Sequence, residues 1–257
     1  MATILALHAH PDDVETLCAG TLALLAQRGH AIRIVSATAG ECGSETTDLA
    51  ATGALRQSEA AAAAALIGAE YRCANLPDLG VFNDDASRRT LTEMLRWAKA
   101  DIIITASPVD YHPDHEAVSL LARDACFAST VPNYRTGPSA PLSAIPHLYF
   151  MDPIEGRDRD GKKVIGDFGV DISTTVALKR DMLGCHRSQV AWVEKQHGIT
   201  DFLEGVASFA RWRGKAFGLS HAEGFRHYRH PPYPRTPLLQ DLLGELVTGP
   251  VQEQAAS

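Results

Sequence analysis

Two short stretches carry most of the ionisable chemistry in this sequence. His10-Pro11-Asp12-Asp13 follows the apolar run 4–7, and DYHPDH at 110–115 follows the apolar run 102–104. Histidine and carboxylate side chains are the usual ligands and acid–base groups of hydrolytic metal sites. The chemistry they could do therefore depends on whether the fold brings the two stretches together.

In the first stretch, His10 and Asp13 are three residues apart across a proline-fixed turn. They can converge on one point while Asp12 faces elsewhere. A simpler interpretation is that Asp12 and Glu15 form a capping box that begins a helix. Capping alone, however, requires neither a histidine two residues earlier nor a second adjacent aspartate.

In the second stretch, His112 and His115 are three residues apart at the start of a predicted helix, so both can lie on one side of it. The simpler alternative is a helix cap supplied by Asp110 or Asp114. If the strands before the two stretches are neighbours, two histidines and a carboxylate form a three-ligand site with one open position. This is the form of a catalytic zinc site, although such ligands also accept Fe²⁺ or Co²⁺.

The remaining polar residues of the two stretches have candidate catalytic roles. Asp12 is the candidate general base for a water activated by the metal. His112, expected in its protonated form, is the candidate group that stabilises negative charge on a carbonyl oxygen. Asp114 is expected to orient or charge a neighbouring histidine. His8 shares the strand face of His10 but lies deeper, so we expect it to pack behind the site.

The elements that must position these residues alternate between strand and helix. Hydrophobic patterns predict strands at 3–9, 31–38, 71–76, 101–107 and 147–152, with helices between them at 14–28, 54–68, 87–100 and 115–129. This alternation predicts an α/β fold: a three-layer, Rossmann-like, mostly parallel sheet with helices on both faces. Ligands bind such sheets beyond the carboxyl ends of the strands, where the strand order reverses.

The second half of the sequence is less regular. A charged loop or hairpin is predicted at 156–167, helices at 174–196 and 202–218, and a proline-rich extended segment at 229–237. We expect one domain over 1–257, with a proline-rich carboxyl-terminal arm over about 226–257 that frays at 251–257.

Composition excludes several classes of function. The 257 residues carry a formal net charge of -7, which argues against nucleic-acid binding because phosphate backbones need a concentrated positive face. No apolar run reaches the ~18 residues of a membrane helix, and the amino terminus lacks a signal-peptide pattern, so no membrane partner is expected. The 5 dispersed cysteines are typical of reduced thiols in a cytoplasmic protein.

At these stretches the sequence resembles the LmbE-like (PIG-L) zinc-dependent de-N-acetylase family. The family pattern is HPDD after the first strand and HPDH after a later one, and both stand here unaltered. The resemblance extends through TAGECGS, LRQSEAAAAAALIG, LPDLG, KRDMLGCHRSQ and HAEGF. Within the family the sequence looks most like the bacterial N-acetylglucosaminyl-malate deacetylase-like branch. The proline-rich arm suggests contacts between subunits of a homo-oligomer, and the resemblance permits a trimer or a hexamer.

The resemblance assigns roles to individual positions: zinc ligands at His10, Asp13 and His115, the general base at Asp12, the stabiliser of the tetrahedral intermediate at His112, a carboxylate supporting that histidine at Asp114, and a substrate-pocket arginine at Arg56. Arg56 could instead be a surface arginine paired with Glu59. Weaker candidates for substrate contacts are Glu41, in the loop after the second strand, and Asp78, which turn chemistry also explains. Gln189 and Glu223 could be functional or structural.

The expected function is that of a metal-dependent hydrolase that removes the acetyl group from an N-acetylated amino sugar or its conjugate, releasing acetate and a free amine. One alternative is an amidase acting on another N-acyl natural product or thiol conjugate, and another is a non-catalytic metal-binding protein. A nucleotide-binding oxidoreductase would need GxGxxG after the first strand, where HAHPDD stands instead.

Overall fold

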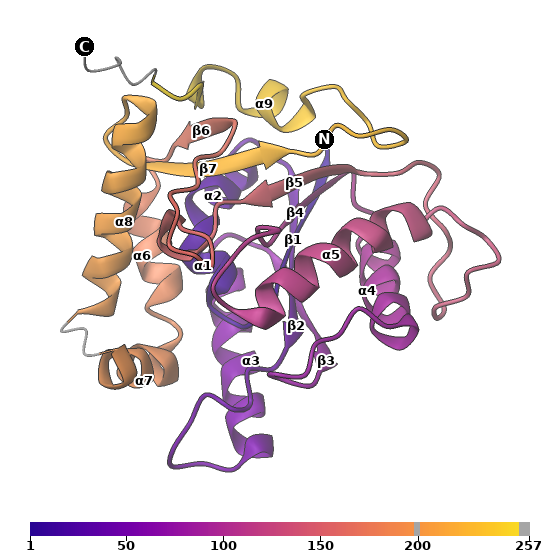
Figure 1. The fold of residues 1–257 in the computed structure, drawn as a ribbon, viewed down its shortest axis with the longest axis horizontal. Coiled ribbons are helices and arrows are strands. Elements are labelled where there is room, and N and C mark those ends of the chain that lie inside the picture. The colour runs from indigo at the N-terminus through magenta and orange to yellow at the C-terminus, as the bar shows by residue number, and fades with distance from the viewer. Residues whose placement is uncertain (198–200, 252–257) are drawn as a thin grey trace.

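The computed structural model describes residues 1–197 and 201–251, which fold around one eight-stranded sheet (Figure 1). Its strands are β1 (Thr3–His8), β2 (Ala31–Thr38), β3 (Glu70–Leu76), β4 (Ile102–Thr105), β5 (His147–Met151), β6 (Phe168–Asp171), β7 (Ala222–His227) and β8 (Val247–Thr248), in the spatial order β3-β2-β1-β4-β5-β7-β6-β8. Strands β1 to β5 pair in parallel, whereas β7, β6 and β8 join antiparallel. The predicted mostly parallel sheet is confirmed, and its antiparallel extension was not predicted.

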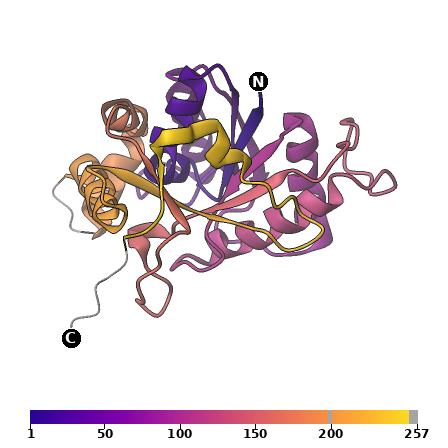
Figure 2. The ribbon, with the colours of Figure 1, turned by 90° about the horizontal axis from the view of Figure 1, so that it is seen from above.

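Helices cover both faces of this sheet (Figures 1 and 2). They are α1 (Asp13–Leu17), α2 (Ala19–Gln27), α3 (Leu49–Ala65), α4 (Asp85–Ala98), α5 (Pro113–Ala128), α6 (Val176–Leu183), α7 (Arg187–His197), α8 (Phe202–Phe217) and α9 (Leu238–Leu243). Alternate residues of β1 point to opposite faces: Ile4 and Ala6 pack into the core shared with α1, α2 and α8, and Leu5 and Leu7 into the core of α4 and α5. The three-layer prediction is therefore confirmed.

The strand order reverses at β1, which lies between β2 and β4. Ile4 is paired with Ile32 on one side and with Ile102 on the other. Because the three strands are parallel, the segments that follow β1 and β4 leave the sheet at the same carboxyl edge. This is the switch point at which ligands bind in such folds.

The predicted helix at 14–28 is divided into α1 and α2 at Cys18, whose backbone (φ −144°, ψ 7°) is not helical. A distant side chain explains the break, since the Glu223 carboxylate accepts hydrogen bonds from the backbone N–H groups of Gly20 (3.0 Å) and Thr21 (2.7 Å). These are orphan donors of a helix amino end. A second helix start is thus stabilised inside what the sequence pattern predicts as one helix.

The carboxyl-terminal arm differs from its prediction as an extended appendage. Residues 222–227 form β7 within the sheet, α9 buries Leu239 and Leu243, and β8 pairs with β6 at the sheet edge. Residues 252–257 lie outside the described residues. None of the helices that the structure describes is long and apolar enough to cross a membrane.

Candidate metal centre

Three side-chain atoms from the two chemical stretches form a small triangle. His10 Nδ1 lies 3.2 Å from Asp13 Oδ2 and 3.2 Å from His115 Nε2, and the last two atoms are 3.4 Å apart. A tetrahedral zinc ion with bonds of about 2.0–2.1 Å has neighbouring ligands about 3.3–3.4 Å apart. The triangle therefore has the size of one face of a zinc coordination tetrahedron, with the fourth vertex left for water or substrate.

The ends of two strands and the starts of two helices place these ligands. Asp13 begins α1, and its Oδ2 accepts a hydrogen bond from the His10 backbone N–H (2.7 Å) and lies 2.6 Å from His8 Nδ1. His115 occupies the first turn of α5, behind Pro113 at the helix start. His8 is fully buried at the end of β1, so it packs behind the ligands as predicted.

The outer nitrogen of each histidine faces a carboxylate. His115 Nδ1 lies 3.1 Å from Asp110 Oδ1, and His10 Nε2 lies 3.1 Å from Asp78 Oδ1. Such carboxylates fix the tautomer of a metal-bound histidine by keeping the proton on the outer nitrogen. When these inner nitrogens are deprotonated, the lone pairs of His115 Nε2, His10 Nδ1 and Asp13 Oδ2 converge. Converging lone pairs need a cation, so this donor set fits a divalent metal.

The electrostatics of the cluster also favour a positive charge at its centre. Burial acts to raise the pKa of Asp13, but His8, His115 and His10 outweigh it and hold that pKa well below its usual range. Burial acts to lower the pKa of His10, but hydrogen bonds to Asp114 and Asp13 dominate and hold it well above its usual range. The cluster thus keeps an ionised carboxylate and binds positive charge.

The Asp12 carboxylate is not used to cap a helix. Asp12 stands at the amino end of α1 with a left-handed backbone (φ 102°, ψ −24°), and its side chain makes no capping hydrogen bond. The capping-box interpretation is therefore wrong. Burial raises the pKa of Asp12 to about 6, despite the nearby Arg56 guanidinium. A carboxylate with a pKa near neutrality is suited to accept and return a proton.

His112 differs from its predicted protonated form. Its Nδ1 accepts the backbone N–H of Asp114 (3.2 Å), so His112 itself caps α5 in place of Asp110 or Asp114. This bond leaves the proton of the neutral ring on Nε2. Burial and the neighbouring His10 and His115 lower the pKa of His112 to about 4. His112 is therefore a neutral hydrogen-bond donor at neutral pH.

Three predicted residues brace the metal ligands rather than line an open pocket. The Asp114 carboxylate accepts the backbone N–H groups of Leu79 (2.8 Å) and Val81 (3.3 Å) and faces His10 Nε2 at 3.5 Å, so it supports His10 rather than His112. Asp78 contacts His10, and its backbone N–H donates to Glu41 Oε1 (2.9 Å). Asp78 and Glu41 therefore make positioning contacts, and their contacts with substrate stay a prediction.

Arg56 lies beneath the site and is only 4% exposed. Its guanidinium donates to the carbonyl oxygens of Gly40 (2.8 Å) and Pro11 (2.7 Å) and to Asp12 Oδ1 (3.3 Å). It therefore joins the loops after β1 and β2 and holds the candidate base, rather than pairing with Glu59 on the surface.

Of the two undecided residues, Gln189 donates to the Gly43 carbonyl (3.1 Å), and Glu223 binds the start of α2 far from the triangle. Sequence reasoning missed the contact of Asp110 with His115, treating Asp110 only as a possible cap. The available signal was its place in the same stretch as His112 and His115.

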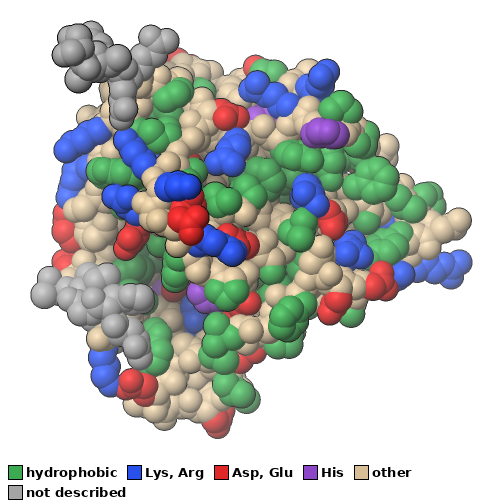
Figure 3. Space-filling model, in the orientation of Figure 1, with side chains coloured by type: hydrophobic (Ala, Val, Ile, Leu, Met, Phe, Trp, Pro, Cys, Tyr) green, Lys and Arg blue, Asp and Glu red, His purple; other side chains and the backbone are tan. Residues whose placement is uncertain are grey.

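On the face drawn in Figure 3, a histidine side chain is visible within a hollow bordered by hydrophobic side chains.

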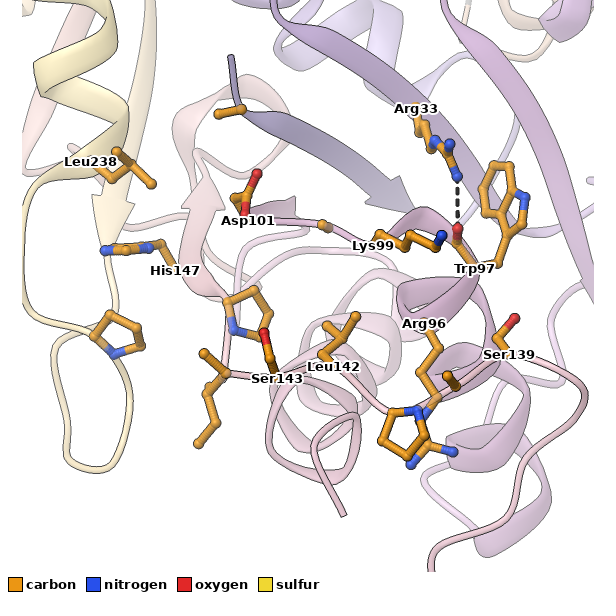
Figure 4. Close-up of a pocket in the computed structure, with 18 of the residues that line it drawn as sticks. Arg33, Arg96, Trp97, Lys99, Asp101, Ser139, Leu142, Ser143, His147 and Leu238 are labelled. Carbon is orange, nitrogen blue, oxygen red and sulfur yellow. Dashed lines mark hydrogen bonds between the residues drawn. The ribbon is translucent and has the colours of Figure 1, made fainter. Parts of the chain in front are cut away.

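A cavity of about 930 Å³ lies at the opposite, amino edge of the sheet (Figure 4). Arg33, Trp97, Asp101 and His147 are among its lining residues, and Arg33 donates a hydrogen bond to the Trp97 carbonyl oxygen (2.7 Å). None of the candidate site residues lines it. This cavity is thus separate from the convergent ionisable groups.

Comparison with known proteins agrees with this site. The family model described as GlcNAc-PI de-N-acetylase (PIG-L) matches residues 5–126. An uncharacterized deacetylase of Escherichia coli, YaiS, is 33% identical over 163 residues, which cover 57% of this chain and 80% of that protein. A 1D-myo-inositol 2-acetamido-2-deoxy-alpha-D-glucopyranoside deacetylase of Nakamurella multipartita is 41% identical over 98 residues, 35% of this chain and 33% of its own length.

Two further comparisons extend the range of relatives. A 4-oxalmesaconate hydratase of Pseudomonas putida is 27% identical over 158 residues, 58% of this chain and 60% of that protein. The match thus spans less than two thirds of both the inositol deacetylase and the hydratase. The solved N,N'-diacetylchitobiose deacetylase from Pyrococcus horikoshii shares the fold, with a TM-score of 0.74, 24% identity, and coverage of 91% of this chain and 88% of that one.

Proposed function

The chain belongs to the PIG-L (LmbE-like) deacetylase family, and on this premise we propose that it is a zinc-dependent hydrolase that removes the acetyl group from an N-acetylated amino sugar or its conjugate. The products are acetate and a free amine. The observation that carries the proposal is the triangle of His10, Asp13 and His115, with the His112 ring 4.7 Å and 4.8 Å from the rings of His10 and His115. Asp12 directly precedes the ligand Asp13 in the chain.

His10, Asp13 and His115 would hold a zinc ion, which would supply Lewis acidity to an amide oxygen and to a water molecule. Asp12 accepts a proton from that water, since its pKa of about 6 leaves it largely ionised at neutral pH. Arg56 holds the Asp12 side chain in place through their 3.3 Å contact. Asp12 can then return the proton to the amine that leaves.

His112 acts on the charge that develops at the amide oxygen. Its neutral ring presents Nε2–H as a donor because Nδ1 is engaged by the Asp114 backbone. A preformed donor that needs no reorientation stabilises an oxyanion more than the ground-state carbonyl. Asp110, Asp78 and Asp114 hold the rings of His115 and His10 during the reaction.

The class of substrate is supported by the family model and by the deacetylase relatives. N-acetylglucosaminyl-malate is the first candidate, from the sequence resemblance. We propose a cytoplasmic location, supported by five free cysteines (Cys18, Cys42, Cys73, Cys126 and Cys185), and a homo-oligomeric assembly. Small molecules rather than nucleic acids are the proposed partners.

The test is acetate release by the zinc-loaded protein from N-acetylglucosaminyl-malate and from N-acetylglucosamine. Asp12→Asn should lower turnover by about 10²–10⁴-fold and keep its zinc, because asparagine tolerates the left-handed backbone. Asp181→Asn, on the exposed side of α6, is the matched control and should retain full turnover. Full activity of Asp12→Asn would show that another group is the base. If neither compound released acetate, the next reactions to test would be hydrolysis of other N-acyl substrates and a hydration like that of the hydratase relative.

A further inference from the structure

We infer that the substrate carries an apolar or aromatic group attached to its N-acetylated sugar, and that an apolar rim formed by Leu79, Phe82 and Tyr111 receives this group. The inference rests on the proposed function and specifies its substrate class, and it favours an apolar conjugate over N-acetylglucosaminyl-malate, whose malate group is polar. It arises from side chains that the catalytic steps do not use.

Tyr111 stands directly beside the candidate catalytic histidine. Its ring meets the rings of His112 and His115 edge-on, with centroids 5.7 Å and 5.8 Å away. Its side chain is nevertheless 59% exposed, while its neighbour Asp110 is buried. An aromatic face that is fixed at the edge of a reacting centre and open to water is a surface on which a flat or apolar ligand group can stack.

Leu79 is exposed by a strained backbone that the site itself holds. Its φ of 60° lies in the left-handed region that favours glycine, yet its side chain is 62% exposed. Its backbone N–H donates to Asp114 Oδ2 (2.8 Å), and this carboxylate also faces His10. A leucine that gains no burial from an unfavourable φ is unexplained by packing. Contact with a bound ligand would explain it.

Phe82 continues the same segment after Val81, whose backbone N–H binds Asp114 while its side chain is buried. Among the described residues, the exposed large aromatic side chains are Phe82, Tyr111 and Phe127. Phe82 follows the two residues whose backbone N–H groups bind Asp114, and Tyr111 directly precedes His112. Grouped exposed apolar side chains mark binding sites more than isolated ones do.

The substrate is the favoured occupant of this rim because the rim is continuous with the reacting centre. Leu79 is joined to it through Asp114, and Tyr111 through His112. An apolar group bonded to the sugar would reach the rim when the acetamido group lies at the metal triangle. A purely polar sugar would leave these side chains in water.

The experiment compares the methyl and 4-nitrophenyl glycosides of N-acetylglucosamine as substrates of the zinc-loaded protein. Wild type should deacetylate the 4-nitrophenyl glycoside with about tenfold higher kcat/KM. Tyr111→Ala should remove most of this preference, measured as the ratio of kcat/KM for the two glycosides. Phe127→Ala changes another exposed aromatic residue, 50% exposed and at the far end of α5 from His115, and should keep the preference.

Leu79→Gly protects the test against misfolding, because glycine accepts the left-handed backbone. It should keep the melting temperature of wild type and lose part of the preference. An unchanged glycoside ratio in both variants would overturn the inference, above all if their molar mass in solution fell, since the rim would then be a subunit contact. No turnover of either glycoside by wild type would instead count against the proposed function, and the inference would fall with it.

Discussion

Two buried polar clusters join distant parts of this chain, and they differ in whether their charged and polar atoms are paired within the protein. The Glu223 cluster consists of Glu223, Lys179 and the amino end of α2: Glu223 Oε1 accepts from Lys179 Nζ (2.5 Å) and the Gly20 N–H (3.0 Å), and Oε2 from the Thr21 N–H. Lys179 Nζ also donates to the Thr16 carbonyl oxygen (2.8 Å), so the ammonium and the carboxylate are paired within the protein. The metal-site cluster, consisting of His10, Asp13 and His115, instead turns three lone pairs towards one point.

This difference separates a structural cluster from a functional one. Both clusters are largely excluded from water and both contain ionised side chains, so burial and charge do not distinguish them. The pairing of charges within the protein distinguishes them. Glu223 and Lys179 pair with each other, whereas the metal-site cluster requires a cation. The following four changes test this distinction, from the largest expected effect to the smallest.

Replacing a ligand should abolish metal binding without unfolding the chain. His115→Ala removes one corner of the triangle, and we expect zinc measured by mass spectrometry to fall from about one ion per chain to almost none. Acetate release should fall to background. Retention of stoichiometric zinc by a folded His115→Ala protein would show that the metal binds elsewhere.

Breaking the Glu223 cluster should lower the stability of the fold and leave metal binding intact. Glu223→Gln leaves the Lys179 ammonium buried without its counter-charge, which we expect to cost about 3–5 kcal/mol of unfolding free energy in urea titrations. The folded fraction should keep its zinc. Adding Lys179→Met should recover part of the loss, and a single variant as stable as wild type would contradict the assigned role.

Chelation should weaken the folded state by a smaller amount. Ions that bind only the native state stabilise it by about 2.7 kcal/mol at 100 times Kd, which corresponds to about 5–10 °C in the melting temperature of a chain this long. The zinc-free protein should therefore melt lower but still cooperatively. The shift should vanish in His115→Ala and persist in Glu223→Gln, and equal shifts in both would remove the distinction.

Replacing Asp110, which contacts the ligand His115 from behind, should have the smallest effect on the protein. Asp110→Asn removes the negative charge 3.1 Å from His115 Nδ1, so we expect zinc affinity in competition titrations to fall about 10–100-fold. Asp181→Asn serves again as the control. Unchanged affinity would indicate that the His115 ring is held by packing alone.

Local sequence predicted the part of the fold that depends on local pattern. The apolar runs of β1 and β4 predicted strands buried on both faces, and the alternation of strands with helices predicted the parallel sheet. The strands β6 and β7 were missed because Gly169 and Gly224 weaken their strand pattern, and β8 was missed because it has only two residues. Their stability comes from antiparallel pairing with distant segments.

For the site, the sequence by itself determined which residues could do the chemistry and which strand ends they follow. The spacing of histidine and aspartate residues within a short stretch is enough to show both. Only the tertiary structure decided what each residue contacts. It placed Asp110 behind His115, set Arg56 on Asp12, turned Asp78 and Asp114 towards His10, and left His112 neutral. These outcomes depend on burial and on distances between segments far apart in the chain, which no local pattern specifies.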